Sequence, residues 1–333
     1  MGKFKLFIKR LLMPLVAGYF RLRTFYPVWF YLLNNKNRRL YQKNPPKLDS
    51  IQTRVLRDLN ATGIAVLDFH ELFPKTEFPN FLERLKQYAH ALKNQPAKTP
   101  KDKPFLRYLL PAVQTELRSP VLEFSFSEKI LSIVNSYLKM WSRFYYLTLN
   151  LTLPVSESSN AIGSQRWHRD PEDKKLCKVF VYLTDVDENS GPFIYIPGST
   201  YGLRLGRLFP QKPPFGFYPK ERMVEKIVKR EDIKILTGKA GTVIFADTAG
   251  LHKGGLAWSK ERIMLTVGYR SDASIMRPRV AFSEDLSRQF KSEGDDVQNY
   301  AREPAEPSKF AKNLSGQYQR WGKELGQALY AEG

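Results

Sequence analysis

Apolar residues recur at helical spacing in three segments of the first half of the chain. In residues 79–92, for example, one face collects the apolar side chains Phe81, Leu82, Leu85, Tyr88 and Leu92. This periodicity predicts helices over residues 51–60, 79–92 and 127–137, with a strand at residues 63–68 after the first of them. Residues 93–103 are polar and predict a loop.

Short apolar runs separated by turn residues occupy much of the chain after residue 143. They predict strands at residues 144–153, 179–183, 193–196, 234–236, 242–245 and 263–269. Gly, Pro, Asn and Asp lie between them, as in the turn at residues 185–192. Many short strands of this kind are typical of a sandwich or barrel and argue against a parallel sheet.

Composition bounds the class of protein. The 333 residues allow one large domain with attachments or two modest ones. Hydrophobic residues make up 42% of the chain, which is enough for a sizeable core and excludes wholesale disorder. The single cysteine, Cys177, excludes an internal disulfide and a Cys-rich zinc framework, and it suits a reducing compartment. Any histidine-based metal site must draw on four residues: His70, His90, His168 and His252.

Positive charge is concentrated at the N-terminus. The formal net charge is +20, and residues 1–48 hold eleven Lys or Arg, ten aromatic residues and no acidic residue. We interpret this arm as short helices lying in an anionic membrane interface. Two alternatives stay open: an arm packed on the domain or a partner, and a true span or signal segment. Against a span, Arg21 and Arg23 lie in the middle of the best apolar window, residues 11–33.

Three regions follow from these patterns. Residues 1–48 form the basic, aromatic-rich arm, residues 49–283 the main domain, and residues 284–333 a polar tail that is helical or partly mobile. No helix-turn-helix, zinc finger or RNA-binding signature accompanies the positive charge, so we expect no nucleic-acid partner. The expected location is cytoplasmic and peripheral at the membrane.

The candidate chemistry lies in the segment QRWHRD at residues 165–170. Residues two apart in a strand point to the same side, so His168 and Asp170 can present an imidazole and a carboxylate to one point. His252 follows a predicted strand, and Arg262 comes ten residues later. Two histidines and one carboxylate form the facial triad of non-heme iron(II) oxygenases, although the same set can hold catalytic zinc or be purely structural. An arginine nearby supplies a fork for a carboxylate.

Four stretches of the chain carry a resemblance to a known family. They are WHRD at residues 167–170, LTDVDENSGPFIYIPGS at 183–199, AGTVIFADTAGLHKGG at 240–255, and Arg262 after them. In this order they resemble the phytanoyl-CoA dioxygenase family, whose members are iron(II)- and 2-oxoglutarate-dependent oxygenases. The resemblance extends back to GIAVLDFHELFP at residues 63–74 and leaves out the arm and the tail.

The resemblance implies a fold and a set of roles. The fold would be mainly β with flanking helices, built as a double-stranded β-helix, or jelly roll. His168, Asp170 and His252 would ligate Fe(2+), and Arg262 would bind the distal carboxylate of 2-oxoglutarate. Asn150 and Phe180 would line the cosubstrate pocket.

The implied reaction uses O2 and yields succinate and CO2. Because Asp170 is present, where related halogenases lack the carboxylate, the resemblance favours hydroxylation of an unactivated C–H bond. The substrate would be a small or lipid-linked molecule. The competing hypothesis is a non-catalytic jelly-roll scaffold at a membrane surface. Elsewhere we expect bland roles: Cys177 as a buried residue and Lys178 as a solvated one.

Overall fold

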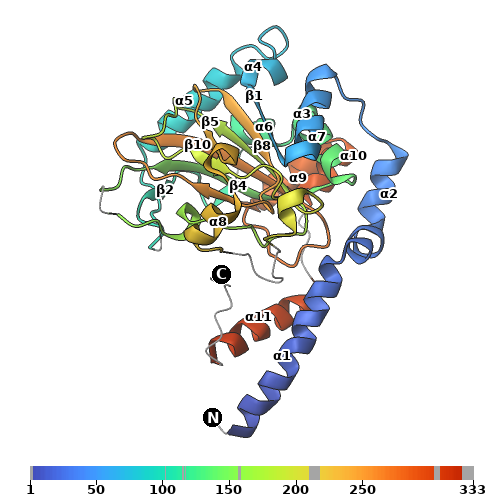
Figure 1. The fold of residues 1–333 in the computed structure, drawn as a ribbon. Coiled ribbons are helices and arrows are strands. Elements are labelled where there is room, and N and C mark those ends of the chain that lie inside the picture. Colours follow the sequence, from blue (N-terminus) through green and yellow to red (C-terminus); the bar gives the residue numbers. More distant parts are fainter. Residues whose placement is uncertain are drawn as a thin grey trace.

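The computed structural model describes residues 3–101, 103–114, 116, 118–156, 159–209, 218–303 and 308–324. Parts of the predicted arm (residues 1 and 2) and of the predicted tail (residues 304–307 and 325–333) lie outside this set. The α-helices are α1 (Lys3–Thr24), α2 (Asn35–Lys43), α3 (Ser50–Thr62), α4 (Phe69–Leu72), α5 (Phe81–Lys93), α6 (Pro120–Ser125), α7 (Glu128–Leu138), α8 (Glu221–Ile227), α9 (Glu284–Glu293), α10 (Asp296–Arg302) and α11 (Lys309–Glu324) (Figure 1). A π-helical turn, η1 (Val28–Leu33), joins α1 to α2.

The strands form one large sheet and two small ones. They are β1 (Ile64–Asp68), β2 (Leu106–Tyr108), β3 (Val113–Gln114), β4 (Arg143–Thr152), β5 (Cys177–Tyr182), β6 (Phe193–Tyr195), β7 (Lys234–Leu236), β8 (Thr242–Ala246), β9 (His252–Gly254), β10 (Arg262–Arg270) and β11 (Ala281–Phe282). The large sheet has the order β1-β8-β5-β10-β4-β2 and is antiparallel throughout. The small sheets are β7-β6-β9 and the pair β11-β3. None of them closes on itself within the described part of the chain.

Side-chain alternation in the large sheet separates two cores. On β5, Val179 and Val181 join the core formed with helices α3, α5, α6 and α7, while Phe180 and Tyr182 face the other way. These two pack with residues of the small sheet, among them Phe193. The molecule is therefore layered: helices, large sheet, small sheet. The candidate site residues lie in the layer between the two sheets.

Local signals explain the first turn of the main domain. Asp49 caps α3 by accepting a hydrogen bond from the Gln52 backbone, and the Gln52 side-chain oxygen accepts one from the Asp49 backbone N–H. Gly63 ends the helix with φ at +83° and leads directly into β1. A Cβ at Gly63 would lie 2.4 Å from the Tyr195 hydroxyl, so this position needs glycine on two counts.

The structure is rich in sheet and has flanking helices, which confirms that part of the predicted fold class. The three predicted helices correspond to α3, α5 and α7, and the seven predicted strands correspond to β1, β4, β5, β6, β7, β8 and β10. The elements that the pattern did not predict are mostly too short for a periodicity to register, such as α4, α6, β2, β9 and β11.

The terminal segments are partly docked on the main domain. Trp29 and Phe30 of η1 belong to the main hydrophobic core, and so do Leu286 and Phe290 of α9. Beyond them α1 projects from the body with α11 beside it (Figure 1). A helix both long and apolar enough to cross a bilayer is not found among the described residues.

Candidate metal centre

His168 and His252 are paired across two extended segments. Each backbone N–H donates to the carbonyl of the other residue at 3.0 Å, and the two ring centroids lie 4.1 Å apart. Asp170, two residues further along, donates its backbone N–H to the Thr248 carbonyl and presents its side chain on the same side as His168. The expectation that residues 168 and 170 share a face is thereby confirmed.

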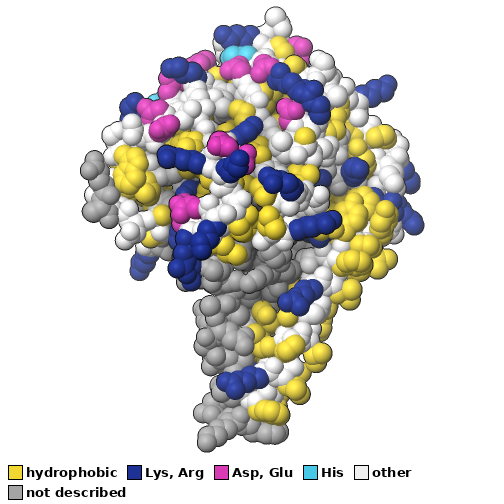
Figure 2. Space-filling view, in the orientation of Figure 1, with side chains coloured by type: hydrophobic (Ala, Val, Ile, Leu, Met, Phe, Trp, Pro, Cys, Tyr) yellow, Lys and Arg dark blue, Asp and Glu magenta, His cyan; other side chains and the backbone are white. Residues whose placement is uncertain are grey.

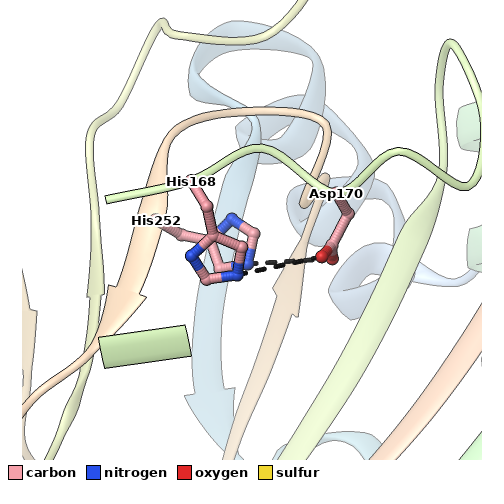
Figure 3. Close-up of side chains that lie close together, drawn as sticks. All are labelled: His168, Asp170 and His252. Atoms are coloured by element: carbon pink, nitrogen blue, oxygen red, sulfur yellow. Dashed lines mark ion pairs between the residues drawn. The ribbon is translucent and has the colours of Figure 1, made fainter. Parts of the chain in front are cut away.

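The three side chains converge on one point. His168 Nε2 lies 3.9 Å from Asp170 Oδ1, and His252 Nε2 lies 3.7 Å from Asp170 Oδ2 (Figure 3). Two ligands at right angles, each about 2.1 Å from a shared ion, would be about 3 Å apart, so a small contraction suffices to close the site. All three residues are buried. The group can hold a metal ion.

Backbone carbonyls fix the tautomer of both histidines. His168 Nδ1 lies 2.8 Å from the Arg166 carbonyl, and His252 Nδ1 lies 3.0 Å from the Gly250 carbonyl. A carbonyl oxygen only accepts, so each Nδ1 carries the proton and each Nε2 keeps its lone pair for a metal. Burial lowers the pKa of His168, and it lowers the pKa of His252 to about 3, with the neighbouring His168 as the next cause. Both rings are held neutral, as metal ligands must be.

Asp170 has a partner that we did not expect. The Lys178 ammonium donates to Asp170 Oδ2 at 2.6 Å, and both side chains are buried. Burial alone would raise the pKa of the Asp170 carboxyl, but the charge of Lys178 holds that pKa well below its ordinary value. The expectation of a solvated Lys178 is therefore wrong. Lys178 precedes Phe180 by two residues on β5, so the two side chains share a face of the strand. This spacing could have predicted that Lys178 points into the site.

All six sequence-predicted site residues lie on the wall of one cavity of about 390 Å³. These residues are His168, Asp170, His252, Arg262, Asn150 and Phe180. Arg262 opens β10, where its Nη2 donates to Thr152 Oγ1 at 3.0 Å and its Nη1 donates to the Gly191 carbonyl. The Arg262 Nε and the Asn150 Oδ1 are buried without a hydrogen-bond partner in the described structure, so polar capacity in this cavity is left for a ligand.

Other residues complete the cavity. The Tyr218 ring stacks on His168 with the centroids 5.5 Å apart. Glu172 is buried, and its Oε1 lies 3.7 Å from Arg279. Burial, followed by the charge of Asp170, raises the pKa of Glu172. The motif gave no signal for Tyr218 or Arg279, because their approach depends on tertiary packing.

The remaining candidates have structural surroundings. Arg169, between the two motif ligands, points to the other side and donates to the Ala249 carbonyl, which braces the turn before His252. His70 lies on α4 and His90 on α5, and neither belongs to the metal-binding group. Cys177 is buried, as expected, and burial raises the pKa of its thiol.

The fold and site together define a layered protein of helices and antiparallel sheets, with a buried group of two histidines and one carboxylate. No protein-family model matches the chain, and no curated protein matches it either. Among solved structures, the chain is similar to EctD from S. alaskensis with 2-oxoglutarate and 5-hydroxyectoine, at 17% identity and a TM-score of 0.48, covering 80% of this chain and 87% of that one. It is also similar to the epimerase SnoN in complex with Fe3+, alpha ketoglutarate and nogalamycin RO, at 15% identity and a TM-score of 0.47, covering 78% and 95%. Similarity at this level does not assign a family to the chain.

Proposed function

We propose that the protein is an iron(II)- and 2-oxoglutarate-dependent dioxygenase. The observation that carries this proposal is the convergence of two imidazole Nε2 atoms and one carboxylate on a buried point, in a cavity that Arg262 also lines. Two histidines and one carboxylate with open positions beside them are the ligand set of non-heme iron(II) oxygenases. The resemblance of the motifs to the phytanoyl-CoA dioxygenase family supports the same conclusion. The layered sheets would then be a double-stranded β-helix.

The residues of the cavity divide into two tasks. His168, Asp170 and His252 would hold Fe(2+), which when bound supplies the activation of O2. Arg262 would bind the distal carboxylate of 2-oxoglutarate through its guanidinium fork, a geometry that suits a carboxylate. Asn150 on β4 and Phe180 on β5, the strands on either side of β10, would contact the cosubstrate from the side. These assignments use only residues that line one cavity.

The reaction we propose is hydroxylation. A C–H bond of the substrate and one oxygen atom of O2 give a C–OH group, while the other oxygen atom and 2-oxoglutarate give succinate and CO2. The retained Asp170 favours this outcome over halogenation, because a halide would need the coordination position that the carboxylate fills.

The substrate class follows from the cavity. Its volume of about 390 Å³ falls at the small end of ligand sites, and its wall mixes aromatic side chains with charged ones. We infer a small polar molecule or the polar end of a lipid-linked one.

The cytoplasm, with the protein peripheral at a membrane, is the location that fits a reduced Cys177 and a basic arm.

The test is turnover of the cosubstrate by the purified full-length chain. With Fe(2+), 2-oxoglutarate and O2, we expect iron-dependent formation of succinate even without substrate, as slow uncoupled turnover. His168→Ala should abolish both iron binding and succinate, whereas His90→Ala, on α5 outside the cavity, should leave both unchanged. A protein that binds iron but forms no succinate with any candidate substrate would favour the scaffold hypothesis instead. A protein that binds zinc in place of iron would defeat the oxygenase assignment.

A further inference from the structure

Helix α1 has an apolar face that is covered within the protein. Met13, Val16 and Phe20 on this inner face are buried. Helix α11 lies against it: the rings of Phe20 and Tyr318 are 6.3 Å apart, and those of Tyr19 and Phe310 are 5.7 Å apart. This packing accounts for one side of the helix only.

A second apolar face of α1 is exposed. Ile8, Leu11, Leu15 and Leu22 follow one another at intervals of three, four and seven residues, which places them in one stripe along a helix. Leu11, Leu15 and Leu22 are 64%, 68% and 57% exposed. Figure 2 shows hydrophobic side chains running along the projecting helix, with Lys and Arg among them. We call these four residues the outer face of α1.

A helix that is apolar on opposite sides is normally buried on both. An exposed stripe of large aliphatic side chains therefore marks a surface that a partner or a membrane covers when the protein functions. The positions between its members include Pro14 and Gly18, which are also exposed and carry no charge. Beyond the helix end, Phe25 is 58% exposed and extends the apolar surface toward the body.

Charge decides what covers the outer face. Arg10 and Arg21 are exposed beside the stripe, and residues 1–48 contain eleven basic residues and no acidic one. Two copies of this helix would bring their positive charges together, which opposes self-association. The same charges attract anionic lipid headgroups. Apolar side chains flanked by basic ones are the pattern of a helix lying in a membrane interface.

We propose that the outer face of α1 docks on the surface of an anionic lipid bilayer. The helix lies parallel to the membrane plane, with Ile8, Leu11, Leu15 and Leu22 in the boundary between headgroups and acyl chains. Helix α11 stays on the aqueous side, because it packs on the opposite face of α1. This inference goes beyond the proposed oxygenase and is independent of whether the site turns over.

The test is sedimentation of the purified full-length chain with phosphatidylcholine vesicles that contain or lack phosphatidylglycerol. We expect binding to the anionic vesicles that weakens with salt. Leu15→Glu and Leu22→Glu should each weaken the partition about tenfold or more, since each side chain loses its apolar burial. Arg21→Gln should weaken it about fivefold on anionic vesicles alone.

The matched control is Ile235→Glu on β7, an equally drastic change at a side chain that is 47% exposed on the body. It should bind vesicles as the unaltered protein does. Thermal unfolding of all variants should be unchanged, because the substituted side chains are exposed. Absence of binding to anionic vesicles would overturn the proposal. So would a Leu15→Glu protein that binds normally, or light scattering that shows a dimer which Leu15→Glu dissociates.

Discussion

The Lys178 ammonium lies 2.6 Å from Asp170 Oδ2 in the wall of the candidate metal centre. The pair is buried, and Lys178 also lies over the Tyr146 ring, with its Nζ 4.9 Å from the ring centroid. A buried carboxylate needs a counter-charge. In the protein without metal Lys178 supplies it, at the carboxylate that we propose as an iron ligand.

Replacing Lys178 by Met should therefore separate folding from metal binding. The metal-free variant should be less stable by about 3–5 kcal/mol, because Asp170 is left buried without its cationic partner. A divalent metal would restore that charge, and removal of the ammonium also ends its repulsion of the ion. We expect metal to stabilise Lys178→Met more than it stabilises the unaltered protein. Urea unfolding with and without Mn²⁺ measures both quantities.

A surface lysine provides the control for this experiment. Lys86 pairs with Glu83 at 3.1 Å on α5, and the Glu83 side chain is largely exposed. Lys86→Met should change stability by less than about 1 kcal/mol and leave the metal effect unaltered. Equal metal stabilisation in Lys178→Met and in the unaltered protein would show that the ammonium does not act on the site.

The sequence predicted those parts of the site that depend on local geometry. The shared face of His168 and Asp170 follows from strand periodicity, and the order of the motifs pointed to His252 and Arg262. The error at Lys178 came from judging a lysine by its type, although its position two residues before Phe180 placed it on the inner face of β5. Lys178 can be buried because it pairs with Asp170, which lies on a different segment of the chain.

Contacts between distant segments were beyond the sequence pattern. The pairing of His168 with His252 requires the register of two separate segments. The docking of η1 includes a hydrogen bond from Trp29 to Asp173, far apart in the chain. An aromatic, basic arm has the same sequence pattern whether it binds lipid or packs on protein, so the sequence did not decide between these two interpretations. In the structure the arm contacts protein at Trp29 and exposes a second apolar face on α1.

Arg262→Lys should weaken the affinity for 2-oxoglutarate about 10- to 100-fold, because a lysine keeps the charge but loses the second arm of the fork. Metal affinity should change little, since Arg262 is not among the three ligands. The measurement is the KM for 2-oxoglutarate in succinate formation, with calorimetry for the metal. Thr152→Val removes the hydroxyl that accepts from Arg262 but leaves the guanidinium in place. If Thr152→Val weakened the binding of 2-oxoglutarate as much as Arg262→Lys does, the arginine would be acting through its protein contacts alone.

Trp29→Phe should destabilise the protein by about 1–3 kcal/mol. The Trp29 indole donates to Asp173 Oδ1 at 2.7 Å in the interior, and its loss leaves a buried carboxylate oxygen with one donor fewer. Chemical unfolding measures the effect. Trp258→Phe is the matched control, because Trp258 is 38% exposed and should tolerate the change within about 0.5 kcal/mol. A Trp29→Phe protein as stable as the control would mean that the arm is not held through this bond.

Asp247 gives the fold a pH dependence that one substitution can remove. Its Oδ1 accepts from the Ala249 backbone at 3.0 Å, and its Oδ2 accepts from the Tyr137 hydroxyl at 2.8 Å. Burial raises the pKa of this carboxyl to about 6, above the ordinary value of 3.8. The native state therefore holds the proton more tightly than the unfolded chain does, and the resulting stability is present below pH 4 and lost as pH rises through 6.

Asp247→Asn cannot titrate, so it should lack this contribution. The stability of the unaltered protein relative to Asp247→Asn should fall by about 2.4 kcal/mol between pH 4 and pH 7. Urea unfolding of both proteins at each pH unit in this range measures the difference, in which the other titrating groups cancel. Parallel stability curves would mean that Asp247 titrates near its ordinary pKa. This carboxylate organises the turn that leads to His252. The same series with metal added therefore compares the pH at which metal binding is lost with the pH at which the stability of the fold falls.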